Sequence, residues 1–244
     1  MAGRLAGKVA LVTGSPPGGI GGAISDRFAA EGALVMRHDR EPNTSLGEDA
    51  FFAADLGDPA ACAALVDETI RRFGRLDILV NNAALTTRST IETTDAAFFD
   101  TMMAVNLRAP LLLIQAAVPH FRAQGGGVVL NIGSVNGHGG GGNLLDYSIT
   151  KGGLMTLSRN LADALGSDHI RVNHFNVGWV LSESEQRLQV REGRPEDWAQ
   201  HVSFPSGRLL LPEEIASFAV TFVEDGGGPV SGAVVDLQQH GRKR

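Results

Sequence analysis

The chain has 244 residues, of which 43% are apolar and 20% charged, and its formal net charge is -6. This length allows one or two domains, and the apolar share is sufficient for a packed core. The basic residues are scattered, which argues against nucleic-acid binding, and the short basic end at 242–244 is expected to be a solvated tail.

Cysteine content and apolar runs bear on the cellular compartment. Cys62 is the only cysteine, so no internal disulfide is possible, as is usual in a reducing compartment. The polar start at residues 1–8 lacks a secretory signal pattern, and no apolar run approaches the ~18 residues of a membrane span. The sequence therefore predicts a soluble, cytoplasmic protein without a membrane partner.

Strand-like and helix-like segments alternate along the whole chain. In chain order we expect a strand at 9–13, a helix at 20–31, strands at 34–36 and 51–54, a helix at 59–73, a strand at 76–80, a helix at 95–124, a strand at 128–132, a helix at 144–165, a strand at 170–176, a helix at 213–223 and a strand at 233–237. This alternation implies parallel pairing with right-handed crossovers, and the nearly continuous apolar strands imply helices on both sheet faces. The sequence predicts one α/β domain over residues 1–244, with a doubly wound parallel sheet of about seven strands.

One stretch, residues 181–206, follows neither pattern. It is highly charged and long, and it carries a few apolar residues on one side. Loops of this length are often functional, so we expect a lid over a site.

A glycine-rich segment joins the first strand to the first helix. Glycines let the backbone turn tightly and approach a pyrophosphate, whose charge is met by amides at the helix N-terminus. The order of strand, glycine loop and helix is the one that a dinucleotide site requires. The residues expected to hold the cofactor here are Gly14, Ser15, Gly19, Ile20 and Gly21.

Asp39 stands 18 residues after Gly21, at the end of the second expected strand. A carboxylate at this place accepts hydrogen bonds from the adenosine ribose hydroxyls and repels a 2′-phosphate, which favours NAD. Arg37 and Arg40 flank it and keep an NADP alternative open, because either guanidinium would attract a 2′-phosphate.

Tyr147 and Lys151 are spaced i, i+4 and so share a helix face. A phenol has a reference pKa near 10, and an adjacent ammonium favours the phenolate. Bringing the pKa to ~7 would take about 4 kcal/mol. Such a tyrosine would take a proton from an alcohol or return one to a ketone.

Together these motifs, with others in the same order, resemble the short-chain dehydrogenase/reductase family over essentially the whole chain. Asn81-Asn82-Ala83-Ala84 corresponds to the family's Asn-Asn-Ala-Gly. Asn106 lies in a Val-Asn-Leu context, Ser134 precedes Tyr147 by 13 residues, and Tyr147 to Lys151 is the family's Tyr-x-x-x-Lys. The resemblance implies a Rossmann-type fold.

The resemblance also implies roles for these residues. Tyr147 is then the general acid/base, Ser134 binds the substrate oxygen, and Lys151 binds the nicotinamide ribose and lowers the pKa of Tyr147. Asn106 supports a water that relays protons to Lys151. The cofactor is held further by Asp55 and Leu56 beside the adenine, by Asn82 and Ala83, and by Val180 and Ser182 at the carboxamide.

Three departures from the family pattern stand out. The loop holds four residues between Gly14 and Gly19 where the family has three. Ala84 replaces a glycine, which is tolerable unless that backbone needs a positive φ. Val177-Gly178 stands for Pro-Gly, and Ser182 for a threonine. None of these removes a catalytic group.

The sequence predicts an NAD(H)-dependent oxidoreductase for a secondary alcohol or ketone, and no metal site, because the histidines and the cysteine show no ligand spacing. A sugar, sugar acid or polyol is the favoured substrate, on account of Asn136, His138, Asn143 and Asp146 near the site. Alternatives are an NADPH-dependent 3-oxoacyl reductase and a non-catalytic dinucleotide-binding sensor. The apolar helices at 95–124 and 144–165 predict a symmetric homo-oligomer, a tetramer or a dimer.

Overall fold

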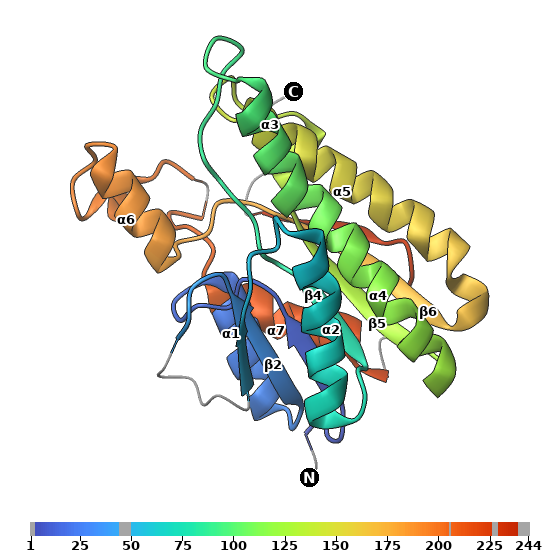
Figure 1. The fold of residues 1–244 in the computed structure, drawn as a ribbon. Coiled ribbons are helices and arrows are strands. Elements are labelled where there is room, and N and C mark those ends of the chain that lie inside the picture. Colours follow the sequence, from blue (N-terminus) through green and yellow to red (C-terminus); the bar gives the residue numbers. More distant parts are fainter. Residues whose placement is uncertain (1–2, 44–49, 205, 226–228, 239–244) are drawn as a thin grey trace.

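Seven parallel strands form one sheet in the order β3-β2-β1-β4-β5-β6-β7 (Figure 1). The structure is a computed structural model that describes residues 3–43, 50–204, 206–225 and 229–238. The basic end at 242–244 and residue 205 of the expected lid lie outside the described residues.

The elements follow the predicted order, with one further helix, α6, inside the stretch 181–206 for which no element was predicted. The strands are β1 (Val9–Val12), β2 (Leu34–Asp39), β3 (Phe51–Ala53), β4 (Ile78–Asn81), β5 (Gly127–Ser134), β6 (Ile170–Val177) and β7 (Val234–Leu237). The α-helices are α1 (Ile20–Ala30), α2 (Pro59–Phe73), α3 (Ala96–Met103), α4 (Ala109–Gln124), α5 (Leu145–Ala164), α6 (Glu183–Arg191) and α7 (Pro212–Val223). The predicted doubly wound parallel sheet is confirmed.

Local signals account for the sharpest boundaries. The Asp58 carboxylate accepts a hydrogen bond from the Ala60 amide (2.9 Å) where α2 begins, and Pro59 occupies the first helical position. Gly74 ends α2 with φ 76°, a left-handed conformation that glycine adopts without strain. The expected helix at 95–124 contains a π-helical turn, Ala104–Arg108, between α3 and α4.

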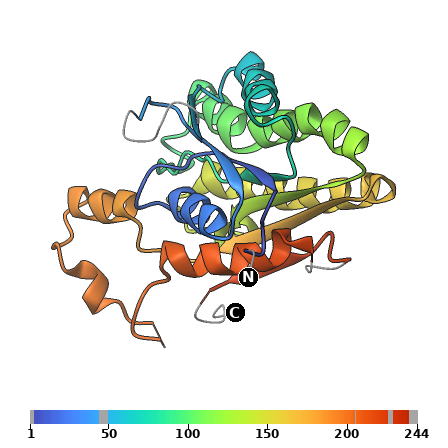
Figure 2. The ribbon, with the colours of Figure 1, turned by 90° about the horizontal axis from the view of Figure 1, so that it is seen from below.

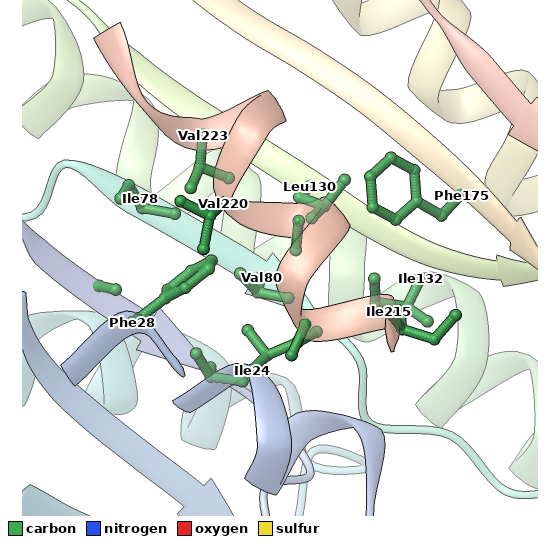
Figure 3. Packing of buried hydrophobic residues seen from close by; sticks show 14 of the residues in the cluster. Ile24, Phe28, Ile78, Val80, Leu130, Ile132, Phe175, Ile215, Val220 and Val223 are labelled. Carbon is green, nitrogen blue, oxygen red and sulfur yellow. The ribbon is translucent and has the colours of Figure 1, made fainter. Parts of the chain in front are cut away.

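Helices cover both faces of the sheet. Figure 2 shows α1 and α7 on one side, and α2, α4 and α5 on the other. Between the sheet and the α1–α7 pair lies a core that includes Ile24, Phe28, Val80, Ile215 and Val220, all buried (Figure 3). A second core under α2 and α4 includes the buried side chains of Leu65, Leu79, Leu113 and Phe121. Burial on both sides explains why the strands read as apolar runs.

One helical segment, Ala96–Gln124, is long and apolar enough to cross a membrane by length and composition alone. Several of its apolar side chains are buried inside this fold, among them Met102, Leu113, Ile114 and Phe121. Packing on the sheet and on α2 therefore accounts for its apolar character.

The strand order places the site. β1 has β2 on one side and β4 on the other, so the chain reverses its direction of winding between β1 and β4. Ligands of open α/β sheets bind outside the carboxyl ends of the strands at such a switch point. The glycine loop after β1 and the Asn-Asn motif at the end of β4 meet there.

Candidate active site

An open cleft of about 1830 Å³ lies at the carboxyl ends of the strands. The glycine loop, the ends of β2, β4 and β5, the first turns of α5, and α6 all contribute to its walls. Of the residues predicted from the sequence, those that line it are Gly14, Gly19, Ile20, Asp39, Asp55, Leu56, Asn82, Ala83, Ser134, Tyr147, Lys151, Val180 and Ser182.

The glycine loop is closed by backbone contacts that leave no space for side chains. Gly14 has φ +60°, and a Cβ on Gly21 would lie 2.2 Å from the Gly14 carbonyl oxygen. The Asn82 side-chain amide donates to the carbonyls of Gly14 (2.6 Å) and Thr13 (3.0 Å). The loop is thereby a shallow cradle of backbone at the N-terminus of α1, which fits a dinucleotide pyrophosphate.

Ser15, a predicted cofactor ligand, is instead fully buried beneath this cradle. Its amide donates to the His38 carbonyl (2.8 Å), and its hydroxyl exchanges hydrogen bonds with the backbone of His38. The His38 ring accepts a hydrogen bond from the Gly14 amide (3.3 Å), and burial lowers its pKa. A neutral His38 therefore fixes the loop to β2.

Asp39 ends β2 on the rim of the same cleft. Its carboxylate accepts a hydrogen bond from the Arg40 amide (2.7 Å). Arg37 is paired with Asp26 (2.5 Å), and Arg40 is exposed beside Glu41 (3.3 Å). Both neighbouring guanidinium groups are thus held by other carboxylates.

Asp55 and Leu56 follow β3 and border the cleft next to Asp39. The Asp55 carboxylate accepts a hydrogen bond from the Gly57 amide (2.8 Å), which fixes its rotamer, and Leu56 is buried. A carboxylate beside a buried aliphatic side chain matches the polar edge and apolar face of an adenine ring.

The catalytic candidates meet between β5 and α5. Ser134, the last residue of β5, accepts a hydrogen bond from the Asn136 amide (3.2 Å) and is hydrogen-bonded to the Tyr147 hydroxyl. The Lys151 ammonium lies 5.6 Å from the centre of the Tyr147 ring and donates to the Ile132 carbonyl (2.9 Å). The sequence spacing thus brings Ser134, Tyr147 and Lys151 together.

Ionisation differs here from the expectation that Lys151 lowers the pKa of Tyr147. Burial raises the pKa of Tyr147 to about 12, although the Ser134 hydrogen bond opposes this, and the Glu185 charge raises it further. Burial also lowers the pKa of Lys151 to about 8. Loss of hydration dominates both groups, because the ammonium is directed at the Ile132 carbonyl rather than at the phenol.

Asn106 occupies the π-helical turn and is fully buried. Its side chain accepts from the Leu85 amide (2.7 Å) and donates to the Leu85 carbonyl (2.9 Å) and to the Thr150 hydroxyl (3.2 Å). Through these three hydrogen bonds the Asn106 side chain connects α5 to the loop after β4. Single π turns inside α-helices occur frequently at functional sites.

Val180 and Ser182 lie where the chain leaves β6 for α6. Val180 forms a parallel bridge with Leu210, and the Ser182 hydroxyl caps α6 by accepting from the Glu185 amide (3.2 Å). Ala84 is accommodated, because His169 is the one non-glycine residue with a positive φ among those described.

The polar residues that suggested a sugar or polyol divide into two groups. Asn136 and Asn143 line the cleft. His138 does not: its ring nitrogen is 2.9 Å from the Asp236 carboxylate on β7. Asp146 is buried and accepts a hydrogen bond from the Thr94 hydroxyl (2.7 Å), so it positions the 89–94 loop instead.

Sequence reasoning missed three residues of the site. Thr13 accepts hydrogen bonds from the amides of Asn82 (3.0 Å) and Ala83 (3.1 Å), and His38 fixes Gly14. Glu185 on α6 enters the cleft wall as a carboxylate. Thr13 and His38 adjoin predicted ligands, but nothing in the charged run around Glu185 marks which side chain faces inward.

Comparison with known proteins shows which family and which individual proteins this chain is similar to. Residues 16–238 match the family described as enoyl-(acyl carrier protein) reductase. A glucose and ribitol dehydrogenase of Daucus carota is 37% identical, over 96% of this chain and 84% of that protein. A 3-oxoacyl-[acyl-carrier-protein] reductase of Thermotoga maritima is 30% identical, over 96% and 97%.

A solved structure is similar over its full length. The L-sorbose reductase of Gluconobacter frateurii, in complex with NADPH and L-sorbose, superimposes with a TM-score of 0.91 at 30% identity and covers 100% of both chains. The names of these relatives thus point to different substrates, although their sequence identities to this chain are similar. Sequence identity alone therefore does not select a substrate, and the residues that line the cleft have to be considered.

Proposed function

Because this chain belongs to the short-chain dehydrogenase/reductase family of oxidoreductases, we propose that it transfers a hydride between NAD(H) and a secondary alcohol or ketone of a sugar or polyol. One observation carries the proposal: Ser134, Tyr147 and Lys151 meet at the floor of a cleft that also holds the dinucleotide cradle.

Each side chain then has a task. Tyr147 exchanges a proton with the substrate oxygen, and the Ser134 hydroxyl steadies charge that develops on it. Lys151 binds the nicotinamide ribose, and Asn106 supports a water that relays protons to Lys151. The nicotinamide, when bound, supplies the hydride acceptor and, in its oxidised form, a positive charge that favours the Tyr147 phenolate.

The substrate class rests on the polar lining, since Asn136 and Asn143 contribute amides to the cleft. A panel of polyols, ketoses, sugar acids and 3-oxoacyl thioesters, each offered with NAD(H) and NADP(H), tests it by absorbance of the reduced nicotinamide. Turnover confined to the thioesters would assign the chain to 3-oxoacyl reduction. No turnover of any substrate, with cofactor still bound, would support a dinucleotide-binding sensor.

Preference for NAD over NADP is part of the proposal and rests on Asp39. We expect Asp39→Ala to narrow the ratio of kcat/KM for the two cofactors by about tenfold or more, because it removes a like charge and two ribose hydrogen bonds. Asp39→Asn removes the charge alone and separates the two contributions. A parental preference for NADP would contradict the assignment and point to Arg37 or Arg40.

We also propose a homo-oligomer, a tetramer or a dimer, built on the helices beside the site. An apolar groove of about 730 Å³ runs between α3–α4 and α5, lined by Met103, Leu107, Leu111 and Leu157. Light scattering should give a tetramer or dimer mass for the parent and a lower mass for Leu111→Asp. Leu34→Asp, also exposed but on β2, is the control, and a monomeric parent at micromolar concentration would refute the proposal.

Residues 181–206 are proposed to order over bound cofactor and substrate. α6 projects from the body of the molecule (Figure 1), and the Arg88–Glu192 ion pair (2.7 Å) links its end to the opposite rim of the cleft. Amide hydrogen exchange in 181–204 should slow when NADH and a substrate analogue are added, while α7 stays unchanged as an internal control. Equal exchange in both states would leave a fixed surface helix.

A cytoplasmic location belongs to the same proposal. Cys62 is a free, buried thiol, and burial raises its pKa, which keeps it in the unreactive protonated form.

A further inference from the structure

The wall of the cleft formed by α6 carries a carboxylate in a fixed position. Glu185 lies in the first turn of α6, three residues after the capping Ser182. The Trp179 indole nitrogen donates to Glu185 Oε1 (2.7 Å), and the Gln189 side-chain amide donates to the same oxygen (2.8 Å). Gln189 is only 2% exposed, so this support is rigid.

The second carboxylate oxygen of Glu185 is unused. Within the described residues no side chain donates to Oε2, and Glu185 forms no ion pair. Because both supporting donors converge on Oε1, Oε2 remains an acceptor in a cleft that Ser134 and Tyr147 also line. The Glu185 charge acts on Tyr147, which places the carboxylate within electrostatic reach of the reacting oxygen.

Three other charged groups that line the cleft have contacts of their own. Arg88 is paired with Glu192 (2.7 Å), although it senses the charge of Glu185. The Arg194 guanidinium lies over the stacked rings of Trp179 and Trp198, at 5.4 and 5.5 Å. The Lys151 ammonium donates to the Ile132 carbonyl. On this wall Glu185 thus presents an acceptor on a firmly held side chain, whereas Arg191 and Arg194 present donors.

We propose that Glu185 determines specificity: its Oε2 accepts hydrogen bonds from substrate hydroxyls next to the reacting carbon, so that the enzyme favours uncharged polyols and ketoses over the corresponding sugar acids. This inference rests on the proposed function. Trp179, which donates to Glu185 and lines the same cleft, adds an apolar surface for the C–H side of such a substrate. An ionised carboxyl at that place in the substrate would meet the like charge of Glu185 in the same cleft.

The kinetic test compares Glu185→Gln with the parent enzyme. Glutamine keeps the shape and an acceptor for Trp179, but it removes the charge. The probes are the best polyol from the panel and the aldonate made by oxidising its terminal CH₂OH. We expect the parent to favour the polyol in kcat/KM and the variant to reduce that preference by about tenfold or more. Glu213→Gln, exposed on α7 and outside both the cleft lining and the segment 181–206, should leave the preference unchanged.

A second measurement needs no substrate. Tyr147 is the only tyrosine in the chain, so the phenolate absorbance band of the cofactor-bound enzyme reports its ionisation directly. Removing the Glu185 charge should lower the pKa of Tyr147, whereas Glu213→Gln should not change it.

The outcomes are distinguishable. An unchanged polyol-to-aldonate ratio in Glu185→Gln contradicts the specificity role, and so does a parental preference for the aldonate, which would assign recognition to Arg194. If the panel shows no turnover, the proposed function fails and this role with it, while the titration still tells whether Glu185 faces Tyr147.

Discussion

Replacing Tyr147 with phenylalanine should lower kcat by about 10²–10⁴-fold while the affinity for NADH changes little. Phenylalanine keeps the ring that lies 5.6 Å from the Lys151 ammonium, so the packing of the cleft floor persists. What it removes is the hydroxyl that is hydrogen-bonded to Ser134 and that exchanges the proton. The loss therefore falls on the chemical step, which single-turnover kinetics and NADH fluorescence titration separate from binding.

Ser134→Ala provides the matched comparison. It leaves Tyr147 in place and removes a hydrogen bond that favours the phenolate, so the pH at which alcohol oxidation reaches half of its maximum should rise. Turnover of Tyr147→Phe near the parental rate would show that another group carries the proton, and the acid/base assignment would then be wrong.

Most of the fold could be predicted because its determinants are local. Periodicity located the seven strands and the helices other than α6, which lies in the stretch predicted to follow neither pattern, and caps such as Asp58 and Gly74 fixed the ends of α2. The π turn at Ala104–Arg108 could not be anticipated, because Asn106 bonds to the Leu85 backbone, which is distant in sequence. The predicted range of β2 was too short: the strand continues to Asp39, since pairing with β3 extends it beyond its apolar run.

The site residues could be predicted where a motif specifies both the residue type and its spacing along the chain, as it does for Tyr147 and Lys151. It was less so where a side chain's direction depends on packing. Ser15 and Asp146 are buried, and His138 faces Asp236, although all three adjoin residues of the cleft. Glu185 lines the cleft because the Ser182 cap fixes the start of α6 and the Trp179 indole nitrogen holds the carboxylate. The pKa of Tyr147 likewise follows from burial, which spacing does not reveal.

Lys151→Met should abolish most activity and yet raise the melting temperature of the cofactor-free protein at pH 7. Lys151 is only 3% exposed, its ammonium donates to the Ile132 carbonyl, and no carboxylate among the described residues pairs with it. Burial lowers its pKa from 10.5 to about 8. At about 1.4 kcal/mol per pH unit, this depression destabilises the native state by roughly 3 kcal/mol.

The sign of the pH dependence follows from the direction of the shift. Below pH 8 the lysine is protonated in both states, and the native state bears the whole penalty; between pH 8 and 10.5 the unfolded chain binds more protons, so native stability recovers. Methionine fills a similar volume without charge, although it leaves the Ile132 carbonyl without this donor. We therefore expect a gain of a few degrees at pH 7, at about 2–4 °C per kcal/mol, and a smaller gain at pH 9. Lys8→Met, which removes only a surface ion pair with Asp225, should change little at either pH. A lower melting temperature for Lys151→Met at pH 7 would mean that the buried ammonium stabilises the fold, and that catalysis retains it at no expense in stability.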